Sequence, residues 1–186
     1  MNKKILFIVL LISLLISTLC FPHATKYKEN LKFSSLVNDA IEIVYAECTL
    51  INKDTQDGPR FAYYNFNVIE SLKGDLESND SFTLKIIYIG ISAKDSLPDF
   101  QLGQKYHLFL KKKQKINDGY PYLLAGGFNR GVIKSLESSA AAYLKASAKY
   151  SAFSKEDLES VSILNELYKE GISSRNLKDL IRKLND

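Results

Sequence analysis

The sequence has 186 residues, 46% hydrophobic and 25% charged, which is the balance of a folded globular chain. Its 25 basic and 21 acidic side chains give a formal net charge of +4, too small an excess for the strongly basic face of a general nucleic-acid-binding domain. Two cysteines allow at most one disulfide within the chain, so a buried core has to supply the stability.

Residues 1–19 are typical of a secretory signal peptide. A short basic head with Lys3 and Lys4 precedes an apolar run from Ile5 to Ile16. The run is shorter than the ~20 residues of a membrane-spanning helix, which disfavours the alternative of a permanent anchor. We therefore expect an exported protein of the periplasm, cell envelope or extracellular space. It would meet a membrane only through this segment or a lipid anchor.

Cys20 is the candidate residue for a special role at the cleavage region, which spans residues 19 to 24. The preceding Ser17-Thr18-Leu19 resembles a bacterial lipoprotein box, in which the cysteine becomes the lipidated first residue. Pro22-His23-Ala24 offers an ordinary cleavage site instead. Both forms of processing stay open at this point.

Residues 36–136 are expected to form short strands separated by turns. In the second strand Tyr64, Phe66 and Val68 alternate with polar residues, which is the period of a half-buried strand. The strand ends on Leu72-Lys73-Gly74, where we expect Leu72 to close the buried face, Lys73 to stay in solvent and Gly74 to turn the chain. The spacing predicts a small antiparallel barrel with strands at residues 39–51, 63–73, 81–88, 103–113, 121–127 and 129–135.

Residues 137–186 are expected to form a helical C-terminal extension of two or three helices. The alanine-rich residues 138–150 favour a helix, and Ser154 with Asp157 resembles a capping box. Gly171 is a natural helix stop. Two apolar stripes, which we expect to pack on the barrel rather than on a partner, are Leu158, Val161, Leu164 and Leu167, and then Leu177, Leu180, Ile181 and Leu184.

No catalytic motif is present, so we expect a protein without enzymatic activity, cofactor or metal site. His23 and His107 lie far from each other in the sequence and do not form a zinc-ligand cluster. By alternation, His107 should face solvent, while Cys48 should be a small buried residue. The alternative is a thiol enzyme in which His107 acts as the base for a Cys48 nucleophile.

A lysine run and a set of tyrosines could each have a structural or a binding role. Lys111-Lys112-Lys113 with Lys115 is interpreted as a solvated strand end that discourages edge pairing. A strand face bearing tyrosines would suit sugars, peptides or single-stranded nucleic acid, but tyrosines also bury their rings and keep the hydroxyl wet. The tyrosines on or beside predicted strands are Tyr45, Tyr63, Tyr64, Tyr88, Tyr106, Tyr120 and Tyr122.

Four segments in order resemble one known superfamily. They are NDAIEIVYAECTL, YNFNVIESLKGD, FQLGQKYHLFL and LLAGGFNRGVI, and together they span about residues 36 to 135. This order is similar to that of the tissue inhibitors of metalloproteinases and netrin-like proteins. The resemblance implies a five-stranded OB-like β-barrel and a protein partner, with inhibition of a metalloprotease as the sharpest form.

The resemblance also implies a role for Cys20. In the animal inhibitors the amine and carbonyl of an N-terminal cysteine coordinate the zinc of the protease, and Cys20 occupies the similar position if its amine is free. The chain lacks the disulfides of that family. The leading hypothesis is therefore an exported, non-catalytic protein-binding barrel. The alternative is a lipid-anchored envelope protein with a structural or scaffolding role.

Overall fold

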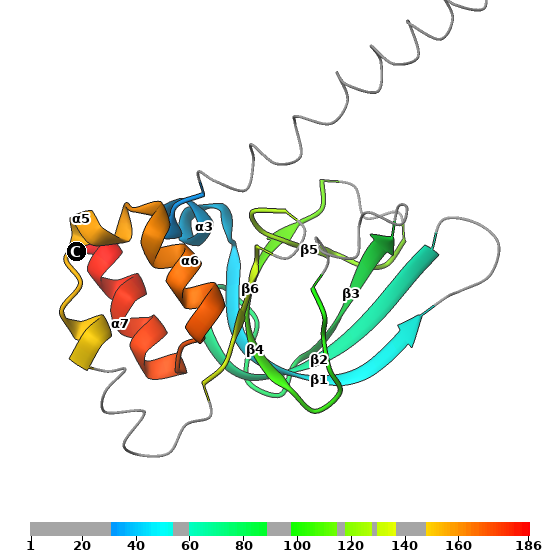
Figure 1. Ribbon diagram of the computed structural model, residues 1–186. Coiled ribbons are helices and arrows are strands. Elements are labelled where there is room, and N and C mark those ends of the chain that lie inside the picture. The colour runs from blue at the N-terminus through cyan, green and yellow to red at the C-terminus, as the bar shows by residue number, and fades with distance from the viewer. Residues whose placement is uncertain (1–30, 54–59, 89–97, 115–117, 128–129, 137–147) are drawn as a thin grey trace, which may run out of the picture. The chain divides into compact units, whose positions relative to one another are not determined.

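The computed structural model describes residues 31–53, 60–88, 98–114, 118–127, 130–136 and 148–186 (Figure 1). The elements in chain order are α3 (Phe33–Asp39), β1 (Glu42–Lys53), β2 (Arg60–Lys73), β3 (Ser81–Tyr88), β4 (Lys105–Lys112), β5 (Tyr122–Leu124), β6 (Val132–Lys134), α5 (Lys155–Leu158), α6 (Val161–Glu170) and α7 (Ser174–Asn185). Residues 32–186 form one compact unit.

The strands form one antiparallel sheet in the order β3-β2-β1-β4-β5, with β6 also paired to β4. The predicted β-rich architecture is thereby confirmed. β1 curves strongly (Figure 1), and its three register irregularities against β2 are of the kind that bend a strand and increase its twist. By hydrogen bonding the sheet is not closed, because β3 and β5 stand at its two ends in the described part of the chain.

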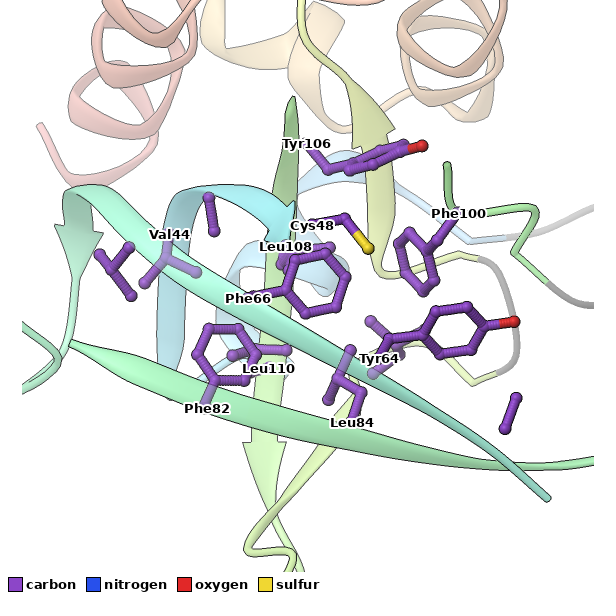
Figure 2. Close-up of a cluster of buried hydrophobic side chains, with 14 residues drawn as sticks. Val44, Cys48, Tyr64, Phe66, Phe82, Leu84, Phe100, Tyr106, Leu108 and Leu110 are labelled. Atoms are coloured by element: carbon purple, nitrogen blue, oxygen red, sulfur yellow. The ribbon is translucent and has the colours of Figure 1, made fainter. Parts of the chain in front are cut away.

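The main core lies on the concave side of this sheet. Alternate residues of β2 and β4 point into it, among them Phe66 and Leu108 (Figure 2). The ring of Phe66 stacks on Phe82 at 5.5 Å between centroids and meets Phe100 edge-on at 5.0 Å. The contact of Phe66 with Phe82 follows from the period-two pattern of β2 and β3, whereas Phe100 lies before β4 and outside the strands.

The helices cover the other face of β1 and β4. Ile43 and Phe109 are fully buried there, and the Phe33 ring of α3 meets Phe109 edge-on at 6.3 Å. Ile172, between α6 and α7, forms a parallel bridge with Ser135. The C-terminal helices are thus joined to the sheet by backbone as well as by apolar contacts.

The helical region differs from expectation in two places. The single stripe from Leu158 to Leu167 is split, because α5 ends at Leu158 and Ser160 begins a new helix as the N-cap of α6. Helix α3 was not predicted at all, although its buried Phe33, Leu36 and Val37 have helical spacing. The capping box and the stop at Gly171 are confirmed. The helix expected at residues 138–150 lies mostly outside the described residues.

The Leu72-Lys73-Gly74 ending joins two elements. Lys73 Nζ donates to the carbonyl oxygens of Val37 at 2.8 Å and Ala40 at 2.6 Å, and so satisfies the C-terminal end of α3. The expectation that Lys73 stays in solvent is therefore wrong. Leu72 is only half-buried.

Gly74 lies against the buried side chain of Glu42, with a φ of +104°. A Cβ atom at Gly74 would stand 2.0 Å from Glu42 Oε2 and 2.7 Å from the Ile41 carbonyl oxygen. That carboxylate oxygen also accepts from the Leu76 amide at 3.1 Å. Glycine is required here by space as well as by backbone conformation.

We expect Gly74→Ala to destabilise the protein more than Gly103→Ala, measured as the free energy of unfolding in urea. Both glycines have positive φ, 104° and 77°, but a Cβ at Gly103 has no neighbour within 4 Å. The shared strain costs on the order of 1–3 kcal/mol. The clash with Glu42 should add about 1–3 kcal/mol at Gly74 alone. Equal losses in the two variants would contradict this account.

Candidate binding surface at the seam between β3 and β5

Of the two cysteines, the structure describes Cys48 alone. Cys20, in either of its expected roles, lies outside the described residues. Cys48 is fully buried in the main core, as expected (Figure 2). Burial raises the pKa of its thiol, which disfavours the reactive thiolate.

His107 is fully buried, so the expectation that it faces solvent is wrong. Its ring stacks on Tyr45 at 5.1 Å between centroids, and its Nε2 lies 3.1 Å from Ser174 Oγ at the start of α7. His107 therefore faces the helical layer, whereas Cys48 faces the core on the opposite side of the sheet. The structure does not bring this pair together.

The contact between Ser174 and His107 has the atoms of a nucleophile and a base. Desolvation alone lowers the pKa of His107 to about 4. An imidazole with that pKa is a weak base at neutral pH. The pair is better suited to joining α7 to β4 than to activating the serine hydroxyl.

Within the described residues, no three His, Cys, Asp or Glu side chains gather in a metal-binding arrangement. Nor does any described helix combine the length and apolar character that a membrane span requires.

Side chains bridge the seam that hydrogen bonding leaves between β3 and β5. Phe82 of β3 meets Tyr122 of β5 edge-on, with 5.7 Å between ring centroids. Asp118, just before β5, accepts from Lys113 at 3.1 Å and pairs with Lys85 of β3 at 3.4 Å. The Lys113 hydrogen bond is the largest cause of the lowered pKa of Asp118, so this carboxylate is charged at neutral pH.

Three aromatic rings hold the Lys85 ammonium on the outer side of the seam. Its Nζ lies 4.4 Å from the ring centroid of Phe61, 5.8 Å from that of Tyr63 and 5.6 Å from that of Tyr120. Tyr63 and Tyr120 also pack on each other at 5.4 Å between centroids. Cation–π attraction and ring contact therefore fix these side chains in place.

A shallow hollow of about 540 Å³ adjoins this cluster through Lys113. Asp39 at its rim pairs with Lys111 at 3.3 Å and accepts from the Gly126 amide at 3.1 Å. The Gly126 hydrogen bond is the main reason that the pKa of Asp39 is lowered. The hollow is lined by Asp39, Lys111, Lys112, Lys113, Gln114 and Leu123.

The lysine run Lys111-Lys112-Lys113 lies at the end of β4. The ladder with β1 stops at Leu110, and within the described residues Lys111 and Lys112 are paired on the β5 side alone. Both line the hollow, and Lys112 is exposed. Lys115 lies outside the described residues.

We call this continuous region the seam surface. It carries four lysines and two aspartates, a net charge of +2, together with three aromatic rings and an exposed leucine. Its members are Phe61, Tyr63, Lys85, Lys111, Lys112, Lys113, Asp39, Asp118, Tyr120 and Leu123. The sequence singled out Tyr63, Tyr120 and the lysine run. It did not indicate the ion pairs, or the contacts of Asp118 and Tyr120 with Lys85 of β3.

A scan of the sequence against models of known protein families finds no match, and a search of curated proteins finds none either.

We expect the stability of the protein to rise with pH between about 4 and 6.5 because of His107. The folded pKa of about 4 lies below the ordinary value of 6.5, so the unfolded chain binds the extra proton in this window. The stabilisation is complete above pH 6.5 and falls by about 3 kcal/mol towards pH 4.

Urea unfolding of the wild type and of His107→Gln at several pH values gives the free energy of unfolding of each protein as a function of pH. Carboxylates contribute to both curves, so the difference between the two proteins isolates His107. A pH-independent difference would show that His107 does not titrate in this way.

Proposed function

We propose that the protein is an exported, non-catalytic binding module that engages a protein partner through the seam surface. The strand order, with a long curved β1 shared between two ladders, supports an OB-like barrel whose last gap is filled by side chains. The proposal agrees with the resemblance to the metalloproteinase inhibitors and netrin-like proteins. Protease inhibition through Cys20 is its most specific form.

The seam surface is the observation that carries the proposal. Binding surfaces combine aromatic anchors with polar groups, and tyrosine and phenylalanine are enriched in them. Here the rings of Phe61, Tyr63 and Tyr120 are already held by Lys85 and by one another. Because these side chains are ordered before a partner arrives, association would cost less conformational entropy.

We expect a photo-crosslinking amino acid at Leu123 to give a discrete protein adduct in the producing cells. Leu123 is 39% exposed and lines the hollow. The matched control is Leu102, which is 65% exposed and precedes the opposite end of β4, roughly 25 Å away along an eight-residue strand. The crosslinked mass, seen by immunoblot, should appear from position 123 only. Equal adducts from both positions, or none from position 123, would refute the proposed surface.

Mass spectrometry of the mature N-terminus separates the two forms of the proposal. Protease inhibition requires a processed chain that begins with an unmodified Cys20, because zinc coordination needs a free amine. A diacylglyceryl adduct on Cys20 would instead support the lipid-anchored envelope protein and exclude the zinc-binding role. An intact segment 1–19 in the purified protein would contradict export by cleavage.

A further inference from the structure

We infer that the segment of the partner that lies on the seam surface is an acidic peptide that also carries aliphatic side chains. The inference rests on the proposed function, since it names the chemistry of the partner at the same surface. It is based on the excess of positive charge on this surface, on the fixed positions of Lys85 and Lys113, and on the contacts among the aromatic rings.

The positive charge of the seam surface is only partly balanced from within. Asp118 is shared between Lys85 and Lys113, and Asp39 is shared between Lys111 and the Gly126 amide. Lys112 is exposed, and within the described residues no carboxylate pairs with it. The site therefore has two positive charges that a partner with carboxylates would complement.

Two of the lysines, Lys85 and Lys113, are held in place before binding, which favours selective recognition. Lys85 is fixed over the Phe61 ring at 4.4 Å, and the side chains of Lys85 and Lys113 are only 19% and 15% exposed. Ammonium groups ordered in this way lose little further entropy when an anion docks. They would also attract that anion over a distance of about 10 Å at moderate salt.

The aromatic rings disfavour nucleic acid as the occupant. Binding of single strands depends on ring faces that are free to stack on bases. In the seam surface Lys85 lies over Phe61, while Tyr63 and Tyr120 pack on each other. The rings therefore act as supports for the cation and as apolar walls, and such walls suit the aliphatic side chains of a peptide.

The extent of the surface sets the length of the segment. Lys85 of β3 and Lys113 after β4 share the Asp118 carboxylate, at 3.4 Å and 3.1 Å, so a few residues of a peptide reach both ammonium groups. The exposed Leu123 beside the lysines would meet an apolar side chain next to an acidic one.

Selection from a random display library of eight-residue peptides on the processed, exported protein tests the inference. We expect enrichment of glutamate and aspartate interleaved with aliphatic residues. A fluorescein-labelled peptide from the selection should then bind in anisotropy measurements, with an affinity that falls as salt rises. Lys112→Gln should weaken binding about threefold to fivefold, because it removes one exposed charge contact. The control Lys155→Gln, an exposed lysine on α5, should leave the affinity unchanged.

Three results would overturn the inference: enrichment of peptides without acidic residues, equal loss in the two lysine variants, or tighter binding of oligothymidylate or an anionic polysaccharide than of the selected peptide. The Leu123 crosslink distinguishes this failure from that of the proposed function. If position 123 gives an adduct but the selected peptides are not acidic, a protein partner binds this surface through different chemistry. If position 123 gives no adduct, the proposed function fails as well.

Discussion

The pairing of β1 with β4 is the constraint on which the rest of the fold depends. Residues Glu42–Glu47 of β1 pair with Lys105–Leu110 of β4, and both faces of this ladder are covered. One face contributes Leu108 and its neighbours to the main core, while the other buries Ile43 and Phe109 under helices. Once this ladder forms, the C-terminal helices become a second layer over the sheet, and α3 is placed where Lys73 satisfies its last carbonyls.

The same constraint leaves a surface free for function. Helices that cover β1 and β4 do not extend over the seam between β3 and β5 (Figure 1). Backbone hydrogen bonds stop there, so the gap is bridged by Asp118 and by the contact of Phe82 with Tyr122. The charged and aromatic side chains on the outer side of this junction are half-buried, as Lys85 and Tyr120 show. Stability and the proposed recognition thus depend on the same residues, and a partner would bind to groups that the fold already holds in place.

The errors of sequence reasoning lie at places where strands have unexpected neighbours. His107 alternates with core residues, and alternation implies solvent only when one face of a sheet is wet. Because α7 covers that face, His107 is buried and joins Ser174. Lys73 was assigned to solvent because its partners, the carbonyls of Val37 and Ala40, lie more than 30 residues away.

The sequence by itself determined the strands, their inward faces, the capping box of α5 and the stop at Gly171. These are local properties, set by period-two alternation, helical spacing and the conformational freedom of one residue, and they need no knowledge of distant contacts. Tertiary structure alone decided which faces are covered, which strands are inner and where the lysines meet the aromatic rings. The seam surface belongs to the second group. Its ion pairs and ring contacts join residues from β2, β3, β4 and the turn before β5, which only the folded sheet brings within a few ångströms of each other.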